Sequence, residues 1–147
     1  MENNLIDILN KILTNTLEYK EVLDDLAEEV SERSIQKKLI ELAEIKKKQS
    51  KVLMKIISAI GGDVQSSERI TDQHLVSWMS PPIPHAGNRG EILNFLVKTE
   101  QNARQDYQKI LNHKDLDDKG KSELKVQLQK CNDTLKGFGQ FNESPDK

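Results

Sequence analysis

Apolar residues recur at alternating steps of three and four along four segments of the chain, which is the spacing of amphipathic helices packed in a bundle. The first stripe consists of Leu5, Leu9, Ile12, Thr16, Tyr19, Leu23, Leu26 and Val30. The second consists of Ile35, Leu39, Leu42, Lys46, Gln49, Leu53, Ile56 and Ile60. The third and fourth consist of Leu93, Leu96, Glu100, Ala103, Tyr107 and Ile110, and of Leu124, Leu128, Cys131, Leu135 and Phe138. The pattern predicts helices over about residues 4–30, 34–60, 90–113 and 118–136.

Glycine and proline separate these segments cleanly. Neither occurs in residues 1–60. They then occur in Gly61-Gly62, in the run "SPPIPHAGNRG" over residues 80–90, at Gly120, Gly137 and Gly139, and at Pro145. Breakers placed in this way indicate long uninterrupted helices between them. Asn3 or Asn4 is expected to cap the first helix, and Ser31 or Ser34 the second, because short polar side chains satisfy free amides at helix starts.

The lengths of the connections predict the topology. Short turns near residues 31–34 and 114–117 make helices one and two, and helices three and four, antiparallel pairs. Residues 61–89 are long enough to travel the length of a helix, so helix three should start at the same end as helix two. The prediction is an all-α, ferritin-like four-helix bundle, up-down-down-up, with a short helix from Thr71 to Met79 in the crossover. Residues 1–138 form one domain, and residues 139–147 a flexible C-terminal tail.

Composition and charge restrict the classes of partner. The chain has 147 residues, 35% hydrophobic and 31% charged, with 22 basic and 24 acidic residues and a net charge of −2. This balance predicts no strong attraction to nucleic acid or to an anionic membrane. The lysine run 46–48 is most simply a solvated helix face. No stretch approaches the roughly 18 apolar residues of a membrane span.

The single cysteine, Cys131, cannot form an internal disulfide, and no Cys-x-x-Cys zinc motif exists. The first residues have neither a basic region nor a cleavage site typical of a secretory leader. Together these observations predict a soluble protein in a reducing, cytoplasmic setting.

The inner stripes become polar near their centres. Glu100 occupies the central position of the third stripe, at the expected height of Thr16, Lys46 and Cys131. Three interpretations are open: Glu100 reaches water at the edge of the stripe, binds a metal, or forms a buried cluster with Lys46 and the hydroxyls of Tyr19 and Tyr107. Glu100, Tyr19, Tyr107 and Lys46 are therefore candidate binding residues.

The metal interpretation lacks its usual ligands. Carboxylate-bridged metal bundles use two Glu-x-x-His pairs on facing helices. Thr71, Pro82 and Ile110 stand three residues before the histidines, His74, His85 and His113, so no such pair exists. An ammonium at position 46 would repel a metal ion. We therefore expect no metal and no cofactor.

His74 and Trp78 form a second candidate binding pair. Their i, i+4 spacing would place imidazole and indole on one face of the crossover helix. Trp78 then either plugs the flank of the bundle while His74 bonds a nearby carbonyl, or both side chains wall a small pocket. Ser77 and Cys131 have no assigned base, and no phosphate-binding glycine loop is present, so no catalytic residues are expected.

The chain resembles a bacterial ferritin-like four-helix-bundle family of about 150 residues that is known as a domain of unknown function. The resemblance rests on the order of four pieces: "LEYKEVLDDLAEE", "KLIELAEIKKKQSKVLMKIISAIGGD", "HLVSWM" and "ILNFLVKTEQNARQDYQKIL". It implies the ferritin-like fold and a bacterial origin, and it implies no established activity. Members of the family often have a histidine near the position of Asn132, and this departure argues further against metal chemistry.

The sequence thus favours a non-catalytic binding or protein-interaction module. A ferritin-like metal-binding or oxidative-stress protein with a degenerate di-metal site is the alternative. A further alternative is an assembly protein, most simply a homodimer. Its expected face consists of apolar residues off the main stripes, namely Ile6, Leu13, Ile40, Ile45 and Val52.

Overall fold

A computed structural model describes residues 5–64, 78–79, 83–84 and 89–143, with side chains as far as Phe138. These residues form four α-helices: α1 (Leu5–Glu29), α2 (Arg33–Ala59), α3 (Arg89–Leu111) and α4 (Asp118–Glu143). The described parts of the chain contain no strand. The four predicted helices and the all-α class are therefore confirmed.

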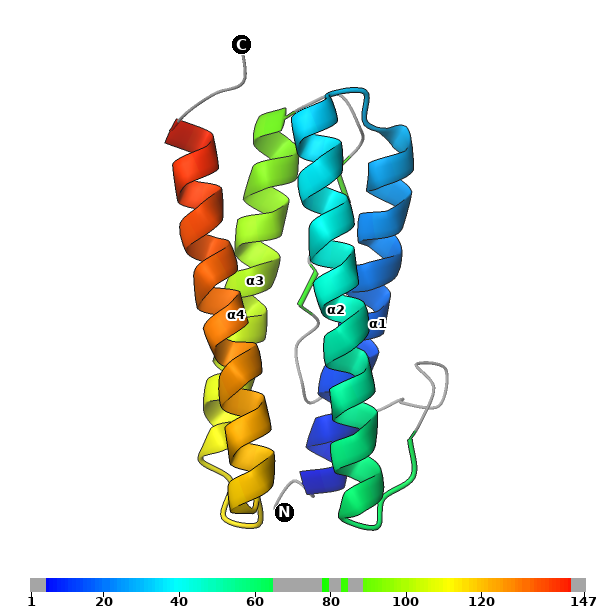
Figure 1. The fold of residues 1–147 in the computed structure, drawn as a ribbon, viewed down its shortest axis with the longest axis vertical. Helices are drawn as coiled ribbons and strands as arrows, with labels where there is room; N and C mark the ends of the chain where they lie inside the picture. The colour runs from blue at the N-terminus through cyan, green and yellow to red at the C-terminus, as the bar shows by residue number, and fades with distance from the viewer. Residues whose placement is uncertain (1–4, 65–77, 80–82, 85–88, 144–147) are drawn as a thin grey trace.

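The four helices lie side by side as two antiparallel hairpins, α1 with α2 and α3 with α4 (Figure 1). The turn of the first hairpin lies at one end of the bundle, and that of the second at the other. As a result α2 and α3 run in the same direction. The ion pair between Arg89 Nη1 and Glu32 Oε2, 3.2 Å long, joins the start of α3 to the start of α2.

Three local predictions differ from the structure or lie outside it. Helix α2 is capped by Glu32, which is extended and makes no side-chain capping bond; neither Ser31 nor Ser34 takes that position. Ser34 Oγ instead donates to Glu32 Oε2. Helix α4 passes Lys136 and continues to Glu143, because two glycines at about 1 kcal/mol each do not end a long helix. Most of the predicted crossover helix lies outside the described residues, and Trp78 and Met79 form a bend.

The hydrophobic core follows the predicted stripes. Leu9 and Leu23 on α1 and Leu39 and Leu53 on α2 are fully buried, and Leu124, Cys131 and Phe138 are buried on α4. Leu128 is only partly buried. Leu13, assigned to a dimer face by the sequence, is instead fully buried in the core.

The double glycine that ends α2 is required by its surroundings. Gly61 has φ of +87°, a left-handed conformation that favours glycine. A Cβ atom on Gly62 would lie 2.8 Å from Ile6 Cγ2 and 3.0 Å from Ile57 Cγ2. Ile6 therefore packs under this turn, which leaves it a poor candidate for a dimer face.

Gly62→Ala is expected to destabilise the protein by about 1–3 kcal/mol, because the added methyl group overpacks the contact with Ile6. Gly137→Ala is the matched control. A Cβ there would meet Lys38 Nζ at 3.7 Å, an ordinary contact, so this helical glycine should tolerate the change or gain stability. Urea unfolding of both variants measures the difference, and equal effects would contradict the packing described for Gly62.

Candidate functional site

A buried ion pair occupies the centre of the bundle. Lys46 Nζ on α2 lies 3.2 Å from Glu100 Oε1 on α3, and their side chains are 1% and 0% exposed. The interpretation in which Glu100 reaches water is therefore wrong, and the pairing with Lys46 is confirmed. The solvated-face interpretation of the lysine run holds for Lys47 and Lys48, which are exposed, and fails for Lys46.

Both candidate tyrosines lie in the same layer and are fully buried. Lys46 Nζ is 5.5 Å from the centroid of the Tyr19 ring, within range of a cation–π interaction. Phe95 meets the same ring edge-on, with centroids 6.4 Å apart. The α1 residue Tyr19 thus covers one side of the ammonium while the α3 carboxylate binds it.

Several polar atoms of this layer have no complete hydrogen bond within the described part of the chain. They are Glu100 Oε2, Tyr19 Oη and Tyr107 Oη. The approach of the Tyr19 hydroxyl to Glu100 falls short of a complete bond, although it is close enough to affect the pKa of Tyr19. Burying polar atoms without complete hydrogen bonds costs free energy, so these three atoms lower the stability of the fold.

Burial dominates the electrostatics of the layer. It is the first cause that raises the pKa of Tyr19 well above 10.0, and the charge of Glu100 is the second. Burial likewise raises the pKa of Tyr107, with Cys131 and Glu100 adding to the effect. The pKa of the Cys131 thiol is raised to about 12, again mainly by burial. At neutral pH the thiol is protonated and is a poor nucleophile.

The two tyrosines are expected to make the fold less stable at alkaline pH. Their pKa values are raised in the folded state, so above the ordinary value of 10.0 the unfolded chain binds fewer protons than the native one. Stability is therefore complete below about pH 10 and falls as pH rises further. Phenolate absorbance should show two tyrosines that ionise only when the chain unfolds. Tyr19→Phe and Tyr107→Phe identify the two contributions, and phenolate formation in the folded protein near pH 10 would contradict the burial.

Trp78 connects this layer to the flank of the bundle. Its backbone N–H donates to Asn15 Oδ1 at 3.2 Å, and its indole Nε1 donates to Asp106 Oδ2 at 2.7 Å. Its carbonyl accepts a bond of 2.8 Å from Asn102 Nδ2. The indole is 1% exposed and lies 6.1 Å from the Tyr107 ring. The plug interpretation of Trp78 is thereby supported, with three polar anchors holding it.

The structure brings together Glu100, Lys46, Tyr19 and Tyr107, and joins Trp78 to them through the Tyr107 ring. His74 lies outside the described residues. Sequence reasoning missed Asp106, whose pKa is raised by burial in spite of the bond from Trp78. Its position directly before Tyr107, at the border of the apolar stripe, was the available signal.

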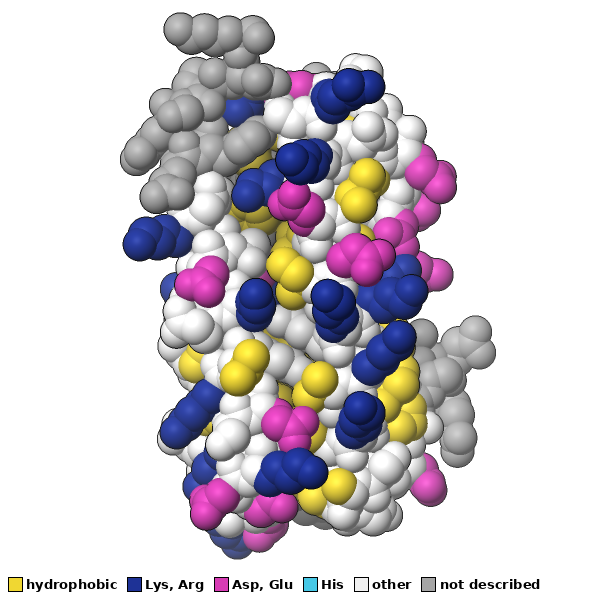
Figure 2. All heavy atoms as spheres, viewed as in Figure 1, with side chains coloured by type: hydrophobic (Ala, Val, Ile, Leu, Met, Phe, Trp, Pro, Cys, Tyr) yellow, Lys and Arg dark blue, Asp and Glu magenta, His cyan; other side chains and the backbone are white. Residues whose placement is uncertain are grey.

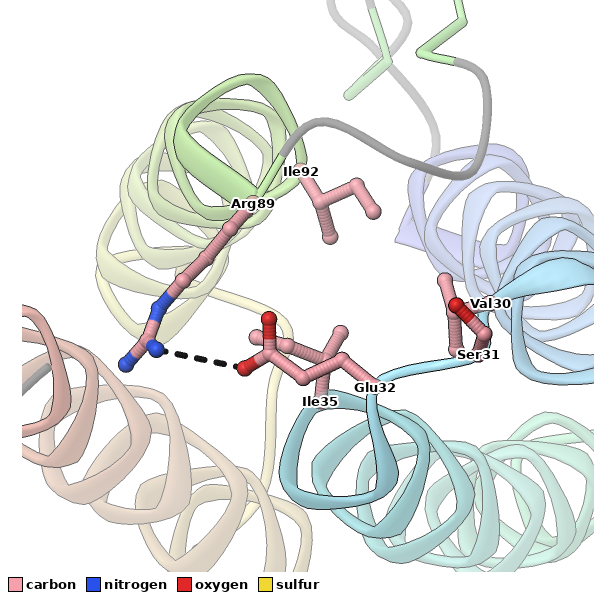
Figure 3. A pocket seen from close by; sticks show the side chains of 6 residues that line it. All are labelled: Val30, Ser31, Glu32, Ile35, Arg89 and Ile92. Atoms are coloured by element: carbon pink, nitrogen blue, oxygen red, sulfur yellow. Dashed lines mark hydrogen bonds and ion pairs between the residues drawn. The ribbon is translucent and has the colours of Figure 1, made fainter. Parts of the chain in front are cut away.

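Two of the hollows formed by the described residues lie away from the Lys46–Glu100 pair. The first, of about 120 Å³, is at the end of the bundle where α2 and α3 begin. Figure 3 shows Arg89 reaching across to Glu32, with Ile35 and Ile92 pointing toward the space between the helices. The hollow is small, and its charged groups are already paired with each other.

The second hollow is a groove of about 380 Å³ between α2 and α4, the α2–α4 groove. It is lined by Ile45, Lys48, Gln49, Val52, Glu123, Val126, Gln127 and Lys130. Gln127 Nε2 donates to the Gln49 backbone carbonyl at 3.3 Å. The remaining side-chain polar atoms of these two glutamines are buried and have no partner among the described residues. The groove thus has apolar walls, and beneath it lie polar atoms that have no hydrogen-bond partner among the described residues.

Within the described ranges, no group of three or more His, Cys, Asp or Glu side chains is placed to hold a metal ion. No described helix is both long and apolar enough to cross a bilayer. No protein-family model and no curated protein matches this chain in sequence. Fold and site together define an all-helical four-helix bundle whose centre is closed by a lysine–glutamate pair.

Proposed function

We propose that this protein is a non-catalytic, ferritin-like helical bundle that works as a binding or protein-interaction module. The observation that carries the proposal is the Lys46–Glu100 pair, 3.2 Å long and buried. In carboxylate-bridged metal bundles the space between the helices is occupied by metal ions. Here an ammonium group lies beside the carboxylate, so the charge of Glu100 is balanced by the protein itself.

The chemistry of the neighbouring groups also supports a role without catalysis. The buried thiol of Cys131 and the two buried phenols are protonated near neutral pH, since burial raises each pKa. None of them is a ready nucleophile or base. The groups that remain to meet a partner are therefore on the surface.

The direction of the helices supports the ferritin-like part of the proposal. Helices α2 and α3 run the same way, which requires one long crossover as in ferritin-like bundles. The proposal includes the bacterial family that the sequence resembles. It also includes a cytoplasmic setting, which the single free cysteine favours.

A selection from a displayed library of random peptides, with the full chain as bait, tests the interaction role. We expect enriched peptides that bind the folded chain saturably with one-to-one stoichiometry in solution. The chain unfolded in urea is the control, since it keeps the composition and loses the surface. A library that yields no saturable binder would contradict the proposal.

One observation favours the alternative, a metal-binding protein with a degenerate di-metal site: Glu100 Oε2 has no complete hydrogen bond. Crystals soaked in iron(II) or manganese(II) distinguish the two functions. We expect no anomalous density beside Glu100, because the Lys46 ammonium repels a cation there. Density that is present in the native protein and absent from Glu100→Gln would establish the alternative.

A homodimer remains a further proposal. Of the five residues expected at its interface, Leu13 lies in the core and Ile6 packs under the Gly61-Gly62 turn. Ile40 is 51% exposed, and Ile45 and Val52 line the α2–α4 groove. Light scattering at high concentration tests it, and a strict monomer would remove it.

A further inference from the structure

The walls of the α2–α4 groove are arranged along two helices that contact each other little. Ile45 and Val52 lie two turns apart on α2, and Val126 faces them from α4. Val126 is 62% exposed, the largest exposure among the large apolar residues described. Three apolar side chains that line one groove between two helices form a strip on which the apolar face of another helix can pack.

The charges beside this strip are mainly positive. Lys48 and Lys130 line the groove together with Glu123. Extended by helical periodicity, the same faces of α2 and α4 also carry Lys38, Glu41, Lys55, Lys119 and Asp133. Lysines thus outnumber acids on this face, whereas acidic residues outnumber basic ones in the whole chain by 24 to 22. In Figure 2, where α2 and α4 are nearest the viewer, yellow apolar patches lie among dark-blue basic side chains and fewer magenta acidic ones.

Buried amide atoms without hydrogen-bond partners in the described structure lie at the base of the groove. Gln49 and Gln127 are 5% and 3% exposed, and three of their side-chain polar atoms have no partner in the described structure. Satisfying these groups on binding would remove a cost that the free protein bears.

We propose that the α2–α4 groove docks an amphipathic helix with acidic flanks, supplied by a partner protein. This inference rests on the proposed interaction role and names the partner's chemistry. Apolar residues of the partner at i, i+3 or i+4, and i+7 pack on Ile45, Val52 and Val126. Aspartate or glutamate beside them pairs with Lys48 and Lys130. A second copy of this chain fits less well, because a two-fold contact would place a basic face against itself.

A designed peptide serves as the probe. It is an acetylated and amidated helix of about three heptads, with leucine at the a and d positions and glutamate beside them. A matched peptide has lysine in place of every glutamate. Fluorescence anisotropy at low salt gives the two affinities, and amide chemical shifts locate the binding site. We expect the acidic peptide to bind at least about tenfold more tightly than the basic one, with shifts concentrated at the groove.

Charge reversal then tests the site. Lys48→Glu with Lys130→Glu should reduce the affinity for the acidic peptide by at least about tenfold. The control pair, Lys47→Glu with Lys125→Glu, makes the same change in net charge on exposed positions of the same helices that point away from the groove. It should reduce affinity by no more than about twofold. Val126→Asp, at a position that is 62% exposed, should also abolish binding.

Three results would overturn the inference: equal affinity for the two peptides, equal effects of the two charge-reversed pairs, or no binding of the acidic peptide at about millimolar protein. A dimer that Val126→Asp converts to a monomer would also overturn it, since a second copy would then cover the groove. If library-selected peptides bind elsewhere on the chain and the acidic peptide does not bind, the interaction role stands and this inference fails. If no peptide of either origin binds, both fail.

Discussion

Lys46→Met is expected to destabilise the protein by about 3–5 kcal/mol, because it leaves the Glu100 carboxylate buried without its counter-ion. Methionine has nearly the length of the lysine stem, so the packing against Tyr19 changes little. The loss of stability therefore measures the effect of removing the charge. Urea unfolding at neutral pH measures the effect.

Lys47→Met is the matched control for this prediction. Lys47 is the next residue of α2 and is exposed, so the same substitution should change stability by no more than about 0.5 kcal/mol. A loss at Lys46 as small as that at Lys47 would mean that Glu100 finds another partner or is reached by water.

Trp78→Ala is expected to cost about 3–5 kcal/mol, because it empties a large buried site against Tyr107. It keeps the backbone bonds to Asn15 and Asn102 but loses the indole bond to Asp106. Thermal or urea unfolding measures the cost. A loss below about 1 kcal/mol would show that the indole is not a structural plug.

Trp78→Phe separates the two contributions of the indole. Phenylalanine keeps an aromatic ring beside Tyr107 and removes the donor to Asp106 Oδ2. We expect a smaller loss, about 1–3 kcal/mol, from the unpaired carboxylate and the reduced ring. Adding Asp106→Ala to Trp78→Phe should then cost little more, since the bond is already absent. A large additional loss would mean that Asp106 has another important partner.

The helices were predictable because the chain repeats its apolar residues with helical spacing, and because residues 1–60 contain neither glycine nor proline. The end of α4 was not, since Gly137 meets only open space and a lysine tip, and nothing there stops the helix. The cap of α2 was also missed. Serine at positions 31 and 34 satisfies the sequence preference, yet the backbone places Glu32 at the helix start.

The central layer was predictable in part. A carboxylate in the middle of an apolar stripe pointed to Glu100, and its height pointed to Lys46. Pattern alone could not decide between burial and contact with water, because a long side chain at a stripe border can do either. The bond from Trp78 to Asp106 could not be predicted from the sequence, since it depends on where Trp78 lies against α1 and α3. The α2–α4 groove could not be predicted from the sequence either, because it results from the spacing of two helices that are far apart in sequence.

A double-mutant cycle on Lys46→Met and Glu100→Leu tests most directly whether a mutually dependent ion pair closes the centre of the bundle. Each single variant leaves one buried charge unpaired and should lose stability, whereas the double variant replaces both with apolar groups and should approach the native value or exceed it. The predicted coupling is at least about 2 kcal/mol. Effects that add within about 0.5 kcal/mol would contradict the account, because the two charges would then be stabilised independently.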